Sequence, residues 1–272
     1  MDISNCDGLE FLKTLKNNSI DLILTDPPYI ISKDSGMNKF TEQVKAIEEQ
    51  GKNVKTEKEW NDYKLKNKIK SDKYKENYLK YGNTSGKKYG YKTDYGDWDK
   101  EFTMEKLEEF IELFYRKLRK GGTCIIFFDL WKLTSLKIAM EKFKFKQIRF
   151  IEWIKTNPVP LNQSVNYLSN TREIALLGVK GGKPTFNSKY DKGIYEYPIQ
   201  NGKGRFHPTQ KSIPLFEELI KKHSNEGDIV LDTFLGGATT AIACKNTKRK
   251  FVGCEINKNY FEKIKSSLEL NI

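Results

Sequence analysis

Short apolar runs alternate along the chain with stretches in which apolar residues recur every three or four positions. The run Ile20-Asp21-Leu22-Ile23-Leu24 is typical of the first kind and predicts a buried strand of a parallel sheet. Strands are predicted at residues 2–4, 20–24, 123–128, 147–154, 173–179, 228–232 and 250–254, and helices at about 9–15, 103–119, 132–143, 214–222, 239–245 and 258–268. This alternation predicts an α/β fold with a doubly wound, mostly parallel, helix-covered sheet of seven strands.

Residues 31–100 break the alternation and predict an insertion. Lysines are interleaved there with acids and tyrosines, while branched apolar residues are sparse, so the segment cannot form much core by itself. Surface helices are expected at 41–50 and 57–70. Lysines among tyrosines suit phosphate contacts and base stacking, and a merely solvated, charge-balanced insertion is the alternative. A second excursion, 181–206, is polar, basic and glycine-bearing, and we expect it to be irregular.

Composition narrows the classes of partner. The chain has 272 residues and a formal net charge of +12, nearly all of the positive charge being lysine, which indicates a polyanion such as nucleic acid. The four cysteines lack CxxC spacing and lie in or near apolar runs, which favours reduced thiols over disulfides or zinc ligands. There is neither a signal peptide nor an apolar run of about 18 residues, so we expect a soluble, cytoplasmic protein with no membrane partner.

The stretch Asp26-Pro27-Pro28-Tyr29 directly follows the predicted strand 20–24 and Thr25. Neither proline can donate to a ladder, so the strand stops there and the backbone carbonyls are held rigidly at its carboxyl end, where open α/β sheets place their ligands. A carboxylate, rigid carbonyls and an aromatic ring suit binding a planar base by its exocyclic amine. An ordinary turn that ends a strand is the alternative.

A second candidate site follows strand 228–232. The turn Thr233-Phe234-Leu235-Gly236-Gly237 leads into a helix, and Glu255 ends the next strand. Glycines let the backbone approach a nucleotide-type ligand, and an acid about 20 residues further on takes the ribose hydroxyls. The turn lacks a third glycine and a Gly-Lys-Ser/Thr sequence, which disfavours a pyrophosphate or triphosphate ligand. A structural turn with a surface acid is the alternative.

The order of these motifs resembles the β arrangement of S-adenosylmethionine-dependent DNA amino-methyltransferases, in which Asp-Pro-Pro-Tyr precedes the Phe-x-Gly turn of the cofactor. The resemblance covers residues 1–30 and about 103–272. It implies a single catalytic domain, 1–272, with a Rossmann-like sheet in circularly permuted methyltransferase order. It also implies double-stranded DNA as substrate, a homodimer, and a bacterial or phage restriction-modification system with a cognate restriction endonuclease.

The resemblance assigns roles residue by residue. Ala238 departs from the usual glycine, Gly237 from a common serine, and Ser212 from a frequent proline. No metal ligand is implied. The implied catalytic residues are Asp26, Pro27, Pro28 and Tyr29, and the implied cofactor-binding residues are Asp7, His207, Thr209, Lys211, Asp232, Phe234, Gly236, Gly237, Thr239 and Glu255.

Three of these assignments have structural alternatives. Asp7 either caps the helix that follows it or accepts a hydrogen bond from the cofactor's adenine amine. Phe234 either packs beside the methyl donor or is a plain core residue, and His207 can simply cap a local turn. The target-recognition segment of the family corresponds to 181–206, which is short here, so sequence reading is expected to be shared with the DNA-contacting insertion 31–100. Lys87, Lys88, Lys203 and Arg205 are the candidate DNA contacts, with a solvated surface role as the alternative for each.

The implied reaction is direct in-line displacement of the methyl group onto the amine of a flipped-out base stacked on Tyr29. Aspartate at the head of the motif favours adenine N6 over cytosine N4, because cytosine-N4 enzymes more often resemble Ser-Pro-Pro-Tyr. A catalytically idle DNA-binding subunit remains an alternative, against which the intact Asp26-Pro27-Pro28-Tyr29 argues. Methylation of an RNA amine or of a protein glutamine is a further alternative, and the absence of asparagine at position 26 argues against the glutamine.

Overall fold

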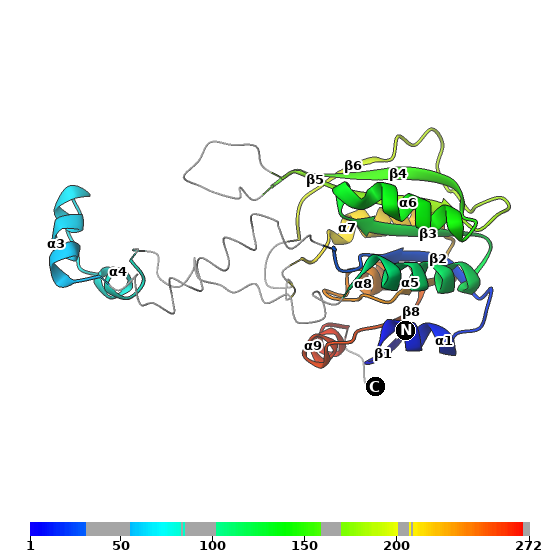
Figure 1. The fold of residues 1–272 in the computed structure, drawn as a ribbon, viewed down its shortest axis with the longest axis horizontal. Coiled ribbons are helices and arrows are strands. Elements are labelled where there is room, and N and C mark those ends of the chain that lie inside the picture. Colours follow the sequence, from blue (N-terminus) through cyan, green and yellow to red (C-terminus); the bar gives the residue numbers. More distant parts are fainter. Residues whose placement is uncertain are drawn as a thin grey trace. The chain divides into compact units, whose positions relative to one another are not determined.

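The computed structural model of the protein describes residues 1–30, 55–82, 84, 102–158, 170–200, 207 and 209–268. The chain divides into two compact units, 1–30 with 97–272, and 31–96. The described residues of the larger unit form one eight-stranded sheet (Figure 1). Its strands are β1 (Asp2–Ser4), β2 (Ile20–Thr25), β3 (Leu118–Phe128), β4 (Lys146–Lys155), β5 (Arg172–Val179), β6 (Ile194–Tyr197), β7 (Ile229–Asp232) and β8 (Lys250–Cys254).

The strands follow the order β1-β8-β7-β2-β3-β5-β4-β6. Only β5 runs antiparallel to its neighbours in this sheet; the other described pairs are parallel. The carboxyl ends of the parallel strands and the amino end of β5 therefore lie along one edge, which we call the carboxyl edge. Register fixes the neighbours there, since Thr25 pairs with Ile126 and Phe128 pairs with Ile174.

Helices cover both faces of the sheet, and alternate residues of each central strand point to opposite layers (Figure 1). In β2, Leu22 and Leu24 join the core beneath α7, α8 and α9, while Ile23 joins the core beneath α1, α5 and α6. Both cores are almost fully buried, as expected for a doubly wound sheet. The helices of this unit are α1 (Gly8–Thr14), α5 (Met104–Lys117), η3 (Leu130–Lys132), α6 (Leu133–Lys142), α7 (Ile213–His223), α8 (Thr239–Asn246) and α9 (Lys258–Leu268).

Two predictions about this unit are wrong. The sheet has eight strands instead of seven, because β6 lies inside the segment 181–206 that we expected to be irregular. Its residues alternate exposed and buried, but four residues are too few to separate a strand from a turn by periodicity. Strand β3 begins at Leu118 instead of residue 123, and the preceding helix ends at Lys117 instead of residue 119, so Gly121 and Gly122 lie inside the strand. Gly121 has φ +78° and donates to the carbonyls of residues 180 and 181, in the stretch of β3 where the pairing with β2 is irregular.

The smaller unit contains two described helices, α3 (Glu57–Lys66) and α4 (Lys75–Tyr81). Helix α3 is shorter than the predicted 57–70, α4 was not predicted, and the helix expected at 41–50 lies outside the described residues. Trp60 packs with Tyr63 and Tyr78 in a small aromatic cluster. Across both units, none of the described helices is long and apolar enough to cross a membrane.

Candidate active site at the carboxyl edge

Asp26 leaves the sheet at the end of β2, one residue after the last ladder position. Its side chain is 19% exposed, and its Oδ2 lies 2.9 Å from Lys211 Nζ. The second oxygen, Oδ1, is buried and has no hydrogen-bond partner among the described residues. Pro27 is buried and Pro28 half-buried. Asp26 therefore presents one carboxylate oxygen that is held and one that remains available.

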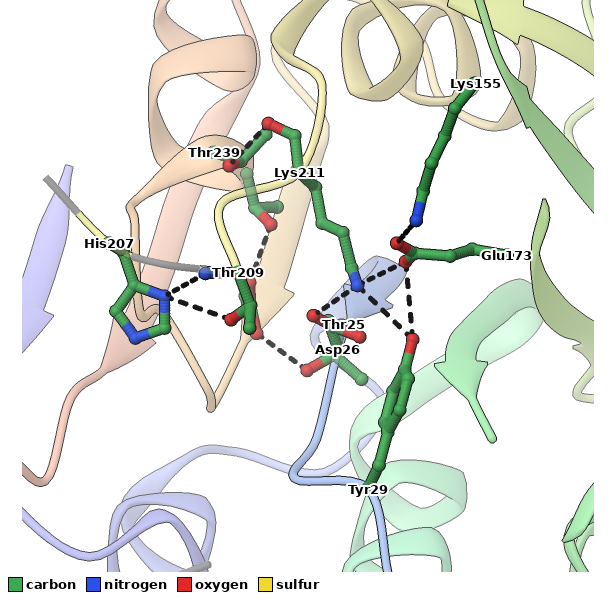
Figure 2. A network of polar contacts seen from close by, with 11 residues as sticks. Thr25, Asp26, Tyr29, Lys155, Glu173, His207, Thr209, Lys211 and Thr239 are labelled. Carbon is green, nitrogen blue, oxygen red and sulfur yellow. Dashed lines mark hydrogen bonds and ion pairs between the residues drawn. The ribbon is translucent and has the colours of Figure 1, made fainter. Parts of the chain in front are cut away.

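Lys211 connects Asp26 to Glu173 of β5 and to Tyr29 of the loop that carries Asp26 itself (Figure 2). Its ammonium lies 2.5 Å from Glu173 Oε2 and donates to the Tyr29 hydroxyl at 3.2 Å. Tyr29 donates in turn to Glu173 at 3.4 Å, and Lys155 pairs with the other oxygen of Glu173 at 2.7 Å. Glu173 reaches the site because β5 is antiparallel, which places its amino end at the carboxyl edge.

Burial dominates the electrostatics of this cluster. Burial raises the pKa of Asp26 to about 6, opposed by the nearby Lys211 ammonium and reinforced by the Glu173 charge. Burial also raises the pKa of Tyr29 well above its usual range. For Lys211, burial alone would lower the pKa, but the Asp26 and Glu173 carboxylates outweigh it and hold the pKa well above the ordinary value. At neutral pH the cluster therefore has ionised carboxylates, a protonated Lys211 and a neutral Tyr29.

Asp232 ends the neighbouring strand β7, and its carboxylate is fully occupied. Oδ1 accepts from the Thr25 hydroxyl at 2.6 Å and from the Phe234 N–H at 3.0 Å, while Oδ2 accepts from the Thr240 hydroxyl at 2.6 Å. These bonds join β2 to the turn after β7 and to the start of α8. The carboxylate of Asp232 thus fixes the shape of the predicted cofactor turn.

The turn itself brings backbone close to neighbouring chain. Gly236 has φ +47° and donates its N–H to Glu255 Oε2 at 2.9 Å, while Glu255 Oε1 accepts from the Asn257 N–H. A Cβ at Gly237 would lie 2.6 Å from the Gln210 side chain, so a larger residue there would require Gln210 to shift. Ala238 adopts φ +58°, a left-handed conformation that explains why glycine is usual there in the resembling family.

The segment 207–211 lies beside this turn. The ring of His207 lies at 3.4 Å from the position of a Cβ on Gly236 and packs edge-on against Tyr260. Thr209 contacts His207 Nδ1 through its hydroxyl at 3.1 Å, and the Thr239 hydroxyl donates to the Lys211 carbonyl at 3.4 Å. The predicted residues of segment 207–211 and the turn at 233–239 are therefore brought together.

Two further predicted residues have structural partners. The Asp7 carboxylate caps α1, accepting from the Leu9 N–H at 2.8 Å and from the Glu10 N–H at 3.3 Å, which confirms the capping interpretation. Its contact with a cofactor stays a prediction. The half-buried ring of Phe234 packs against Phe110 and Phe102, with ring centroids 4.7 and 5.5 Å apart.

Unsatisfied polar atoms gather around the turn after β7. Both polar atoms of the Gln210 amide and the Thr233 hydroxyl are buried with no hydrogen-bond partner in the described part of the chain. Buried polar groups are normally paired, so this concentration suits a polar ligand that carries donors and acceptors. Together with the close backbone approach at Gly237, it fits a nucleoside with an amino-acid tail, such as S-adenosylmethionine.

Three residues of the site were not predicted from the sequence, and four predicted DNA contacts lie outside the described residues. Sequence reasoning did not assign Glu173, Lys155 or Gln210 to the site. Only the position of Gln210 inside the motif His207-Pro208-Thr209-Gln210-Lys211 could have indicated it. The candidate DNA contacts all lie outside the described residues and remain predictions; they are Lys87, Lys88, Lys203 and Arg205.

Comparisons with known proteins define the class. A model of the N6/N4 DNA methylase family, described as "DNA methylase", matches residues 20–266, and the chain belongs to this family. Type II methyltransferase M2.DpnII of Streptococcus pneumoniae is 28% identical over 289 residues, which cover 99% of this chain and 90% of that protein. Type II methyltransferase M.HpaI of Haemophilus parainfluenzae is also 28% identical, over 97% of this chain and 72% of its own length.

Solved structures share the fold over nearly the whole chain. The crystal structure of the M1.HpyAVI–SAM complex is 26% identical with a TM-score of 0.63, covering 99% of both chains. The cytosine-N4-specific PvuII DNA methyltransferase is 14% identical with a TM-score of 0.63, covering 98% of this chain and 84% of that one, which shows a common fold. The protein is therefore a DNA methyltransferase that modifies an exocyclic amine.

Proposed function

We infer that the protein transfers a methyl group from S-adenosylmethionine to the N6 amine of an adenine flipped out of duplex DNA. The single observation that carries this proposal is Asp26, an aspartate at the head of Asp-Pro-Pro-Tyr with one oxygen held by Lys211 and the other unpaired among the described residues. When bound, S-adenosylmethionine supplies a methyl group activated by its sulfonium. The turn 233–239, Glu255 and the segment 207–210 are the residues that would hold it.

The protein's own residues act on the amine. During methyl transfer positive charge develops on the amine nitrogen, so acceptors placed at its hydrogens stabilise the transition state. Asp26 Oδ1 accepts one N–H and the carbonyl of Pro27 accepts the other, which draws the nitrogen lone pair out of conjugation. Tyr29 stacks on the flipped base, a contact worth about 1–3 kcal/mol by analogy with single-strand binders. Orientation supplies much of the rate acceleration.

Several features support this particular substrate. Aspartate at position 26 favours adenine over cytosine within the family, and the net charge of +12 suits a DNA partner. The relatives from Streptococcus pneumoniae and Haemophilus parainfluenzae bear the name type II methyltransferase, which supports a role in a restriction-modification system. On this proposal a cognate endonuclease and a homodimer are expected, with recognition supplied by 31–100 and 181–206.

The test is a labelling experiment. The protein is incubated with tritiated S-adenosylmethionine and unmethylated genomic DNA, and the labelled nucleoside is identified by chromatography. Asp26→Ala runs in parallel, with Asp21→Asn as a control at the opposite end of the same strand. We expect label in N6-methyladenine, lost in Asp26→Ala and kept in Asp21→Asn.

Other outcomes are informative. Label in N4-methylcytosine keeps the mechanism and overturns the base assignment. Absence of label despite binding of DNA and cofactor indicates an idle subunit or another substrate. Equal labelling of single-stranded RNA and duplex DNA contradicts the proposed specificity for DNA.

A further inference from the structure

A chain of charges with alternating sign ends on the catalytic carboxylate (Figure 2). Lys155 on β4, Glu173 on β5, Lys211 before α7 and Asp26 after β2 are joined by ion pairs of 2.7, 2.5 and 2.9 Å. Their side chains are only 12, 18, 8 and 19% exposed, respectively. Each of the four charges loses hydration free energy on burial, so hydrophobic residues of similar volume would make the folded protein equally stable or more stable. The location of this chain at the reacting end of β2 suggests a role in catalysis.

We propose that Lys211 and Glu173 are positioning residues that set the orientation and the charge of Asp26 for methyl transfer. This proposal rests on the proposed function of the same site and deepens it. Neither residue needs to touch the substrate, because each acts through the carboxylate of Asp26.

The orientation follows from how Lys211 uses its donors. An ammonium has three N–H groups, and three oxygens surround this one, from Asp26, Glu173 and Tyr29. With its donors so occupied, Lys211 holds Asp26 Oδ2 and turns Oδ1 away as the remaining acceptor. The same bonds fix Tyr29, whose hydroxyl lies between Lys211 and Glu173. Lys211 is thus committed to the catalytic carboxylate in this structure, whereas family resemblance had assigned it to the cofactor.

The charge of Asp26 follows from its neighbours on every side. Besides Lys211, the groups that face it are Glu173 from β5, Asp232 from β7 and the neutral Tyr29 from its own loop. Lys211 favours the ionised form of Asp26, while the two carboxylates oppose it. The ionised carboxylate accepts the amine hydrogen more strongly than the protonated acid and stabilises the developing positive charge, so activity falls as the pH falls through the pKa of Asp26. The ammonium of Lys211 also pairs with Glu173, so Asp26 is not its only carboxylate partner.

The test is the pH dependence of single-turnover methyl transfer in two variants. Lys211→Met leaves two buried carboxylates without an ammonium between them. The fall of the rate on the acid side of its pH profile, the acid limb, therefore moves to higher pH by about 1 unit or more. Glu173→Gln removes a negative neighbour of Asp26, so the acid limb moves to lower pH. We also expect the plateau rate of Lys211→Met to fall by about 100-fold, because the carboxylate loses its orientation. Shifts in opposite directions are a result that a merely structural role does not produce.

Two controls separate this effect from misfolding. Asp21→Asn removes a carboxylate at the amino-terminal end of β2 that is ion-paired with Arg119 and is 18% exposed, the same as Glu173. We expect the acid limb of this variant to stay where it is in the wild type. Lys155 is an ion-pair partner of Glu173 but not of Asp26. Lys155→Met leaves more of the negative charge of Glu173 unneutralised, so we expect the acid limb to shift slightly to higher pH. If Lys211→Met does not fold, the opposite shifts of Lys155→Met and Glu173→Gln test the proposal alone.

Binding of S-adenosylmethionine is measured by calorimetry in parallel, and we expect wild-type affinity in Glu173→Gln. A wild-type protein that methylates no DNA overturns the proposed function. An active wild type whose acid limb stays unmoved in all three variants overturns the positioning role and leaves the function intact. Loss of cofactor affinity in Lys211→Met with an unshifted limb returns Lys211 to the cofactor site and also overturns the proposal.

Discussion

Asp26 and Asp232 are aspartates at the ends of adjacent parallel strands, but their surroundings differ. Asp232 accepts from two hydroxyls and one backbone N–H, so both of its oxygens are satisfied by neutral donors. Asp26 has one oxygen on an ammonium and one with no partner among the described residues. Burial raises the pKa of both carboxyls, to about 6 for Asp26.

The contrast separates architecture from chemistry. A carboxylate whose oxygens both accept hydrogen bonds, such as Asp232, can hold three elements together, but it has little capacity left for a substrate. A carboxylate with one unpaired oxygen, such as Asp26, destabilises the folded protein and can accept a hydrogen bond that forms only when the substrate is present. Strain of this kind is common at functional sites, where activity is bought at the expense of stability. The predictions below test this distinction, beginning with the largest effect.

Asp26→Asn should have the largest effect on activity. The amide keeps the shape but loses the charge that favours the developing cation, so we expect methyl transfer to fall by about 10²–10³-fold. Stability should move the other way. Folding raises the pKa of Asp26 from 3.8 to about 6, so the ionised carboxyl disfavours the folded state increasingly as pH rises through this window, and fully above it. The variant should therefore melt no lower than wild type at neutral pH.

Calorimetry across the pH range measures this gain, which should vanish below the window where wild-type Asp26 is protonated in both states. A variant that melts well below wild type at neutral pH, or that keeps most of its activity, would contradict the distinction.

Asp232 should respond in the opposite way. Asp232→Ala leaves the part-buried Phe234 N–H and the Thr25 hydroxyl without their acceptor, and leaves the Thr240 hydroxyl with only the Leu24 carbonyl at 3.4 Å. We therefore expect a loss of about 3 kcal/mol in the free energy of unfolding. Asp232→Asn should recover most of that loss, because its oxygen can accept at the Oδ1 position and its NH₂ can donate to the Thr240 hydroxyl. Urea unfolding checks both values. Equal destabilisation by Ala and Asn would show that the charge itself is required.

The turn held by Asp232 gives a third, smaller test. Gly237→Ala places a Cβ 2.6 Å from the buried Gln210 side chain, and overpacking of this kind costs about 1–3 kcal/mol. Gly236→Ala is the matched control, because its Cβ has room at 3.4 Å from His207 but its φ is +47°. We expect Gly237→Ala to weaken binding of S-adenosylmethionine more than Gly236→Ala, as measured by calorimetry. The reverse order would indicate that backbone strain matters more than space.

Much of this architecture could be predicted from the sequence. The run that became β7 ends in the motif residue Asp232, and those that became β2 and β8 are directly followed by Asp26 and Glu255. Parallel strands bring such ends to one edge. The alternation of Leu22, Ile23 and Leu24 between two cores follows from the two-residue period of a strand. The order of the motifs was enough to indicate the family, which the comparisons confirm.

The missing parts depend on strand direction. Nothing in the sequence Arg172–Val179 shows that β5 is antiparallel, and only that reversal carries Glu173 to the carboxyl edge. Lys155 depends on the same pairing, since it lies at the end of β4 beside the start of β5. The ammonium of Lys211 could have been aimed at a cofactor or at Asp26, because its motif specifies sequence but not the direction of a long side chain.

The smallest prediction compares the two hydroxyls that bind Asp232. Thr240→Val leaves Oδ2 with no described donor, whereas Thr25→Val leaves Oδ1 with the Phe234 N–H. Both substitutions preserve shape and remove a hydrogen bond to Asp232 worth about 1 kcal/mol, but only Thr240→Val leaves a buried carboxylate oxygen unsatisfied. We expect Thr240→Val to lower the free energy of unfolding more than Thr25→Val, by about 1 kcal/mol. Activity measured alongside should change little in either variant, and a large loss in Thr25→Val alone would mean that Asp232 acts on Asp26 through the end of β2.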